Sequence, residues 1–193
     1  MGFYKGVGAF LRVFFQLFYR VEIQGRENAL ETGGLVCANH ISAWDPLFIS
    51  SFYPHPISWM AKKELFKNKF LAKILDHLGS FPVERDKNDL GALKKAIRLL
   101  KKGNNVGIFP EGTRVKERDD KMVKPGVGLL ALKTESFVSP VSIQGNYRLF
   151  SKLKLVIHPP LDAHKLLEGK TKGQESYQMV AQGIMDKIYQ SME

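Results

Sequence analysis

Short apolar runs alternate with amphipathic stretches along most of this sequence, and no other feature limits its fold as strongly. The apolar runs are bounded by Gly, Pro, Asn or charged residues, as strands buried in a sheet are. They occupy residues 35–38, 57–60, 80–83, 106–109, 138–143 and 154–157. Residues 89–102 and 174–190 instead repeat their apolar side chains at helical spacing. This alternation predicts an α/β fold, a single layered domain with a central mixed sheet flanked by helices and functional groups at strand ends.

The chain is basic, and its cationic surplus must face a partner. Lys and Arg number 29 against 19 Asp and Glu, a formal charge of +10 in 193 residues. Nucleic acid, an anionic membrane and a phosphorylated substrate are the partners that such a charge suits. The sequence has no zinc-finger spacing, no RRM-like aromatic signature and no basic zipper, so we expect no nucleic acid. A membrane surface and a phosphate group remain.

Cysteine and histidine usage argues against a disulfide and a metal. Cys37 is the single cysteine, which excludes an internal disulfide and a site built from several thiolates. The histidines outside the motif discussed below show no metal-ligand spacing; they are His55, His77, His158 and His164. We therefore expect no metal and no cofactor.

The N-terminal segment is rich in phenylalanine and has a cationic edge. At about 100° per residue, a helix from Phe3 to Val21 has one apolar stripe, with Lys5, Arg12 and Arg20 on the opposite side. Arg12 would lie near the middle of a spanning helix, and a signal peptide would carry its charge first and a cleavage site afterwards. The pattern predicts an amphipathic helix in the membrane interface. The alternative is a helix packed on the core of the domain.

The stretch NHISAWDP, residues 39–46, follows an apolar run and contains the first catalytic candidates. Helical positions five apart diverge by about 140°, but a strand-to-helix turn can fold His40 and Asp45 together. Asp45 would then fix the tautomer of the imidazole, and the other ring nitrogen would act as a base toward a hydroxyl of the substrate. The alternative is that Asp45 is the N-cap of a helix that begins with Pro46.

Further stretches occur in a recognisable order around and after NHISAWD. GSFPVERD at residues 79–86 and FPEGTR at 109–114 each follow an apolar strand with Pro, Glu and Arg, and VSPVSIQ occupies 138–144. With AKKELF at 61–66, this set resembles the glycerolipid acyltransferases, specifically the 1-acylglycerol-3-phosphate acyltransferases, which share the HxxxxD motif. The resemblance covers residues 25–157, and the combination is specific although each piece alone is weak.

The resemblance implies that His40 is the general base and that Asp45 orients it. It also implies a set of substrate-binding residues around the phosphate, namely Lys62, Arg85, Glu111, Gly112, Thr113 and Arg114. Arginine suits a phosphate because it donates in a bidentate fork, and glycine lets backbone N–H groups approach. Because Lys63 adjoins Lys62, either lysine could bind the phosphate, and the motif favours Lys62. The alternative for Arg85 and Arg114 is solvation or pairing with neighbouring glutamates.

The implied reaction moves an acyl group from acyl-CoA or an acyl carrier protein thioester to the sn-2 hydroxyl of lysophosphatidic acid, which yields phosphatidic acid. Such an enzyme would work peripherally at an anionic membrane surface, on the cytoplasmic face of the cell membrane. We expect residues 1–24 to form the membrane-associating helix and residues 25–193 the acyltransferase domain.

Other functions stay open at this point. The acceptor could be glycerol-3-phosphate or another lysophospholipid, and the chain could be a non-catalytic basic membrane-binding module. A binding module needs cations but no oriented base, so the spacing of His40 and Asp45 favours the enzyme. Cys37 offers a covalent route, but a thiol among apolar neighbours has a raised pKa and is a poor nucleophile.

Overall fold

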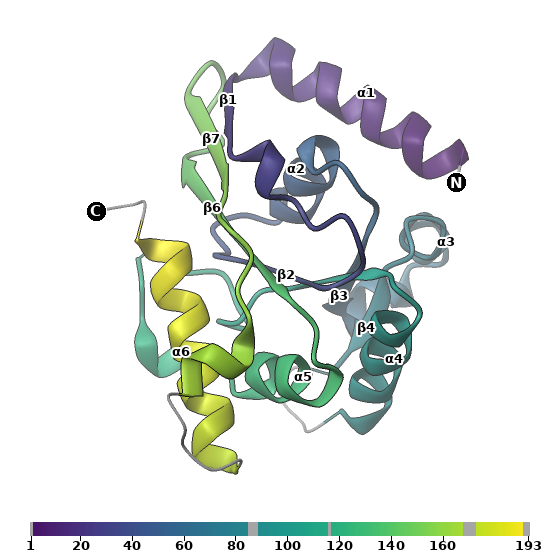
Figure 1. The fold of residues 1–193 in the computed structure, drawn as a ribbon. Coiled ribbons are helices and arrows are strands. Elements are labelled where there is room, and N and C mark those ends of the chain that lie inside the picture. The colour runs from purple at the N-terminus through teal and green to yellow at the C-terminus, as the bar shows by residue number, and fades with distance from the viewer. Residues whose placement is uncertain (1, 85–88, 116, 168–172, 191–193) are drawn as a thin grey trace.

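A seven-stranded sheet with helices on both faces forms the body of the protein (Figure 1). The structure is a computed structural model and describes residues 2–84, 89–115, 117–167 and 173–190. The strands are β1 Arg20–Gln24, β2 Leu35–Ala38, β3 Ile57–Lys62, β4 Phe81–Val83, β5 Asn105–Ile108, β6 Val138–Gly145 and β7 Lys152–Ile157. The helices are α1 Gly2–Phe18, α2 Asp45–Phe52, α3 Lys69–His77, α4 Leu90–Lys101, α5 Gly126–Thr134 and α6 Gln174–Tyr189. Short 3₁₀ helices cover Arg26–Asn28, Lys63–Lys67, Asp120–Met122 and Ala163–Leu167.

The strand order is β1-β7-β6-β2-β5-β3-β4, which places β2 at the centre of the sheet. All neighbouring strands are parallel except β6 and β7, which form an antiparallel hairpin. The predicted mixed sheet is therefore confirmed, and all six predicted strands are present. Because β2, β5 and β6 are parallel, their carboxyl ends meet at one edge of the sheet, where the motif residues follow.

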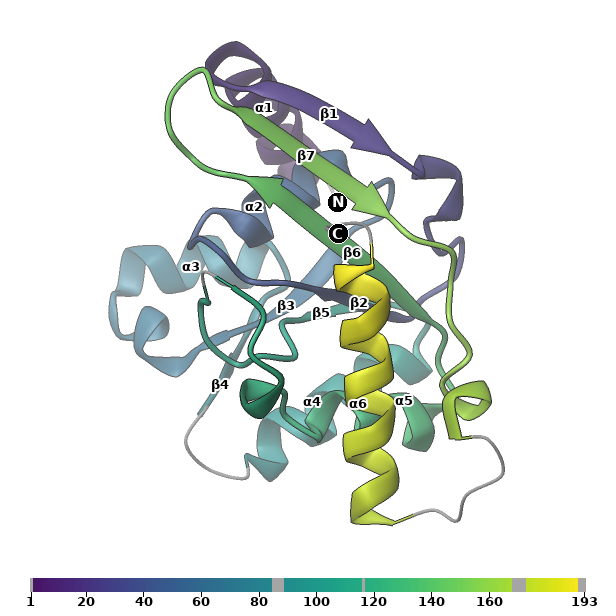
Figure 2. The same ribbon diagram turned by 90° about the vertical axis from the view of Figure 1, so that its left-hand side faces the viewer.

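The core has two layers, one on each face of the sheet. Strand β2 shows the division, because Leu35 and Cys37 pack toward α4, α5 and α6 while Val36 and Ala38 pack toward α1 and α2. Figure 2 shows α4, α5 and α6 below the sheet and α1 and α2 above it. Burial on both faces explains why β2 is a continuous apolar run rather than an alternating one.

The N-terminal helix is shorter than predicted. Helix α1 ends at Phe18, and Arg20 and Val21 belong to the edge strand β1, which pairs with β7. One side of α1 packs on the body, where the ring of Phe15 is buried against Phe48. On its other side Phe10, Val13 and Leu17 are exposed, while Phe3, about half exposed, contacts the ring of His77 in α3. Among the described residues, no helix is long and apolar enough to span a bilayer.

Candidate active site

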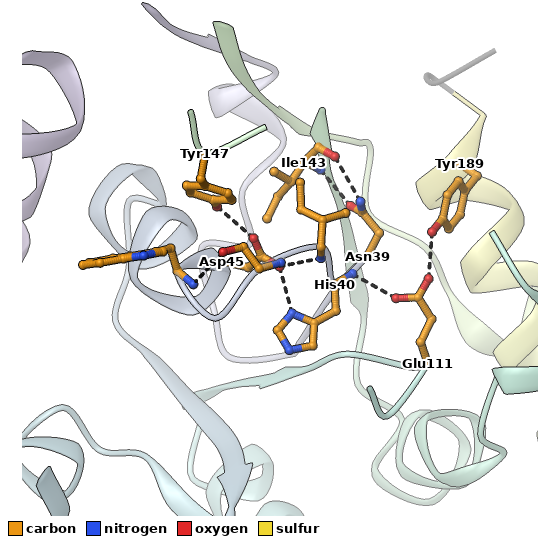
Figure 3. A network of polar contacts seen from close by, with 10 residues as sticks. Asn39, His40, Asp45, Glu111, Ile143, Tyr147 and Tyr189 are labelled. Carbon is orange, nitrogen blue, oxygen red and sulfur yellow. Dashed lines mark hydrogen bonds and ion pairs between the residues drawn. The ribbon is translucent and has the colours of Figure 1, made fainter. Parts of the chain in front are cut away.

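His40 and Asp45 lie together at the carboxyl end of β2, as the spacing predicted. The Nδ1 atom of His40 is 2.8 Å from Oδ2 of Asp45, and both residues are buried (Figure 3). Asp45 is the first residue of α2 and Trp44 is its N-cap, so the predicted alternative of an Asp45 cap is wrong. The carboxylate instead turns back toward the strand end, where it accepts from the backbone N–H groups of Ile41 and Ser42.

The Asp45 carboxylate is held by donors from two parts of the chain. Its Oδ2 atom contacts Nδ1 of His40 and also accepts hydrogen bonds from the backbone N–H groups of Ile41 and Ser42. Both of these backbone hydrogen bonds are 2.7 Å long. Its Oδ1 atom accepts a hydrogen bond of 2.8 Å from the hydroxyl of Tyr147, in the connection after β6. Burial and the neighbouring Asp45 charge raise the pKa of Tyr147, so this hydroxyl keeps its proton and remains a donor.

The FPEGTR loop is fastened to the backbone of His40 at two points. The N–H of His40 donates to Oε2 of Glu111 at 2.9 Å, and the N–H of Val115 donates to the carbonyl oxygen of His40 at 2.8 Å. Oε1 of Glu111 accepts a hydrogen bond of 2.7 Å from Tyr189, the last residue of α6. Burial, as the largest cause, raises the pKa of Glu111. Glu111 is therefore buried next to the backbone of His40, rather than at the surface (Figure 3).

Aromatic rings support the imidazole from the side. The ring of Phe109 stacks on that of His40 with 4.0 Å between centroids, and the indole of Trp59 stacks on Phe109 at 4.8 Å. Gly107 makes room for the indole, since a Cβ there would lie 2.4 Å from Cε3 of Trp59. The stack and the Asp45 contact together fix the plane of the imidazole and leave Nε2 as the ring nitrogen that can accept a proton.

A cavity of about 670 Å³ opens beside this site. Phe109, which stacks on His40, also lines the cavity, as do Gly112 and Thr113 of the same loop. Its inner wall is apolar and comes from α4, α5 and α6; it includes Leu93, Val127, Leu130 and Tyr177. A cavity of this size, lined mainly by apolar side chains with a few polar groups, suits an apolar ligand.

The predicted phosphate-binding cations lie at the surface, so far as the structure describes them. Arg114 is exposed and directly precedes Val115, whose N–H is bound to His40. Lys62 ends β3 and is half exposed, with its Nζ atom 3.8 Å from Glu64. The ammonium of the adjacent Lys63 pairs with Glu84, so each of the two lysines has a glutamate partner. Arg85 lies outside the described residues.

The thiol of Cys37 is buried within β2, on the face of the sheet that packs on α4 to α6. Burial raises its pKa well above the ordinary range, so the thiolate is scarce. The covalent alternative thus lacks both an exposed nucleophile and an ionised one.

Tyr147 and Tyr189 are the residues of this network that the sequence did not indicate. Each contacts a motif residue from a distant part of the chain, 102 positions from Asp45 and 78 positions from Glu111. A single tyrosine outside any motif offers no spacing from which such a contact could be inferred.

Comparison with known proteins identifies the family. The sequence profile of the family described as Acyltransferase matches residues 20–144 of this chain. The chain belongs to the acyltransferase family. It is 36% identical over 165 residues to the 1-acyl-sn-glycerol-3-phosphate acyltransferase of Bacillus subtilis, with 82% of each chain covered. A protein of the same name from Borreliella burgdorferi is 29% identical over 186 residues, which cover 90% of this chain and 72% of that one.

A solved structure has the same fold as this acyltransferase. The crystal structure of the 1-acyl-sn-glycerophosphate (LPA) acyltransferase PlsC from Thermotoga maritima matches with a TM-score of 0.70 and 30% sequence identity. The match covers 98% of this chain and 78% of that one. The chain is therefore an enzyme of the acyltransferase class, and its α/β sheet arrangement is shared with a solved relative.

Proposed function

We propose that this acyltransferase moves an acyl group from a thioester to the sn-2 hydroxyl of 1-acylglycerol-3-phosphate and so forms phosphatidic acid. The observation that carries the proposal is the buried pair of His40 and Asp45, 2.8 Å apart, at a strand end beside an apolar cavity. The relatives named above, which are 1-acyl-sn-glycerol-3-phosphate acyltransferases, support the choice of acceptor.

His40 acts as the general base in the proposed reaction. With Nδ1–H held by Asp45, Nε2 takes the proton of the acceptor hydroxyl while its oxygen attacks the thioester carbonyl carbon. The tetrahedral intermediate collapses with cleavage of the C–S bond, and the leaving thiolate receives the proton from Nε2. The products are an ester and a free thiol, and His40 returns to its starting state. Tyr147 positions this pair through Asp45, and Glu111 does so through the backbone N–H of His40.

The phosphate of the acceptor is bound by the exposed cations near His40. Arg114 belongs to the FPEGTR loop, next to Val115, whose N–H binds the carbonyl oxygen of His40. Lys62 ends β3, and because β3 and β5 are parallel, it lies at the same edge of the sheet as the carboxyl end of β5. Arg85 completes the proposed set. Gly112 has a φ of +70°, a backbone conformation that a side chain would strain, and it turns the loop from the buried Glu111 outward to Thr113 and Arg114.

The acyl chain of one substrate occupies the apolar cavity, and the acceptor is delivered from a membrane surface. Helix α1 lies in the interface with Phe10, Val13 and Leu17 toward the lipid, since these side chains are exposed on the side away from the body. The enzyme is thus peripheral, on the cytoplasmic face, where its thioester donors are acyl-CoA or acyl carrier protein. Replacing both Phe10 and Val13 with Asp should release it from anionic vesicles in a flotation assay.

One acylation assay tests the reaction. Purified protein is given acyl-CoA or an acyl carrier protein thioester with lysophosphatidate, glycerol-3-phosphate or a phosphate-free monoacylglycerol, and product formation is followed. His40→Ala should lower kcat by about 10² to 10⁴-fold, whereas Cys37→Ala should keep full turnover. Near-parental turnover by a folded His40→Ala protein would contradict the mechanism, and a preference for glycerol-3-phosphate would contradict the acceptor.

A further inference from the structure

The connection between β6 and β7 ends in a tight turn whose tip is apolar and exposed. The N–H of Ser151 donates to the carbonyl oxygen of Arg148 at 3.1 Å, so Leu149 and Phe150 are the two central residues of a four-residue turn. Both of these side chains are 63% exposed. The turn is braced from below by Asn146, which accepts from the Arg148 N–H at 3.0 Å and from the Ser151 hydroxyl at 2.6 Å.

Phe150 occupies a backbone conformation that disfavours it. Its φ is +62°, in the left-handed region, and a residue with positive φ at the third position of a β-turn is ordinarily Gly or Asn. An aromatic side chain is strained there, and its exposed ring gains little from packing in the folded protein. A strained and exposed ring indicates a contact outside the folded chain.

The turn is attached to the end of α1. The N–H of Phe150 donates to the carbonyl oxygen of Phe18 at 2.7 Å, and Nε of Arg20 donates to the carbonyl oxygen of Phe150 at 3.1 Å. Figures 1 and 2 both show this connection at the same end of the molecule as α1. The tip therefore lies next to the C-terminal end of α1, where Leu17 is exposed.

The charged residues around the tip are mainly cationic. Arg20, Arg148 and Lys152 are exposed, and the neighbouring Glu22 is paired with Lys152 at 2.6 Å. Apolar tips ringed by Arg and Lys match a bilayer with anionic headgroups, since the apolar groups enter the acyl region while the cations stay at headgroup level.

We propose that Leu149 and Phe150 form a second membrane-docking element, which inserts into an anionic bilayer beside α1. This inference rests on the proposed function, in which the acceptor resides in lipid. It adds a consequence for the reaction, because Tyr147 directly precedes the turn and its hydroxyl binds Asp45. When the tip docks, the segment that contains Tyr147 therefore lies against the membrane surface from which the acceptor arrives.

The strain at Phe150 gives the test two readouts of opposite sign. Phe150→Gly and Phe150→Asn both suit the left-handed backbone, so each should raise the Tm of the full-length protein by about 2 to 4 °C. Each should also weaken co-sedimentation with phosphatidylcholine vesicles containing phosphatidylglycerol by about 10-fold, the worth of one buried apolar side chain. A residue that merely supports the fold would lower Tm when replaced.

Phe137→Ala is the matched control. Phe137 is also exposed, but it precedes β6 and so lies at the opposite end of that strand from the tip. Its replacement should leave vesicle binding unchanged. Parental vesicle binding by both Phe150 variants, or an equal loss in Phe137→Ala, overturns the proposal. The proposal is also overturned if, without lipid, the parent protein is a dimer and Phe150→Gly is a monomer, because the tip would then contact a second copy of the chain.

Vesicle binding is measured without substrate, so its outcome is separate from that of the proposed reaction. Failure to acylate lysophosphatidate together with the expected binding contrast would overturn the reaction and leave the docking element standing. Acylation of lysophosphatidate without any binding contrast would overturn the docking element alone. In the vesicle acylation assay, Phe150→Gly should lose more activity toward membrane-embedded acceptor than toward a short-chain, water-soluble one.

Discussion

Removal of the Tyr147 hydroxyl tests whether Asp45 depends on its second anchoring point. Tyr147→Phe keeps the ring against Phe48 and Tyr19 and deletes the single hydrogen bond of 2.8 Å to Oδ1 of Asp45. A hydrogen bond to a charged group is worth about 1.5 to 3 kcal/mol, or about 10- to 150-fold if it is fully expressed in the rate. Because three contacts to Oδ2 remain, we expect the lower part of that range, a loss of about 10-fold in kcat.

The assay is steady-state acyl transfer at saturating thioester, with KM and kcat separated for both substrates. Loss of orientation should lower kcat and leave the KM of the thioester unchanged. Asp45→Asn serves as the background of a double-mutant cycle, since an amide there cannot orient the imidazole in the same way. Adding Tyr147→Phe to it should cost less than about 2-fold further, which is the signature of two residues acting as one unit.

Tyr53→Phe is the control for the loss of a buried hydroxyl. The Tyr53 hydroxyl accepts from the Leu30 N–H at 3.0 Å and donates to the Ser139 hydroxyl at 3.2 Å, and neither contact involves His40, Asp45 or Glu111. It should lower Tm without lowering kcat. The reasoning about Asp45 fails if Tyr147→Phe turns over within 2-fold of the parent, or if its effect is fully additive with that of Asp45→Asn.

Three other perturbations follow from the site. Arg114→Ala and Lys62→Ala should each raise the KM for lysophosphatidate by about 10- to 100-fold; an equal loss with a phosphate-free monoacylglycerol would refute phosphate binding. Gly107→Ala should displace the Trp59 indole, lowering both Tm in thermal unfolding and kcat, because core overpacking costs about 1 to 3 kcal/mol; unchanged values would show that the ring stack does not support His40. Burial raises the pKa of Glu111, so its contribution to stability is present below the ordinary carboxyl range and is lost as pH rises through the raised pKa; Glu111→Gln should flatten that slope of Tm against pH, and an unaltered slope would count against it.

The sequence predicted the sheet well because its central strands β2, β5 and β6 are largely buried, but it misplaced the end of α1. Strand β1 has the sequence RVEIQ, in which Val21 and Ile23 alternate with polar residues, as an edge strand should. The apolar stripe of α1 runs directly into it, and Val21 also fits the helical period. Two periods that overlap at a boundary cannot be separated by pattern alone, and only the pairing of β1 with β7 decides between them.

The contact between His40 and Asp45 was predictable because the two residues are close in sequence, whereas the groups that hold the pair are not. Asp45 needs donors on both oxygens, and the chain meets this need with the local N–H groups of residues 41 and 42 and with Tyr147. Local motifs can therefore reveal which side chains of a site contact each other. Tertiary contacts supply the remaining restraints: Tyr147 in the β6–β7 connection binds Asp45, and Tyr189 at the end of α6 binds Glu111. Glu111 in turn accepts from the backbone N–H of His40.

The FPEGTR stretch illustrates how one motif serves two purposes. Gly112, with its positive φ, forms a turn between Glu111 and Arg114. Glu111 is buried next to the backbone of His40, whereas Arg114 is exposed. A substrate phosphate bound directly by Glu111 would place two anions together in a buried site, which is strongly unfavourable. The two charged side chains of the motif therefore have different partners: Glu111 accepts from the backbone N–H of His40, and the exposed Arg114 is the one proposed to bind the phosphate. The proposed phosphate binding by Arg114 therefore depends on the turn that the intervening glycine allows.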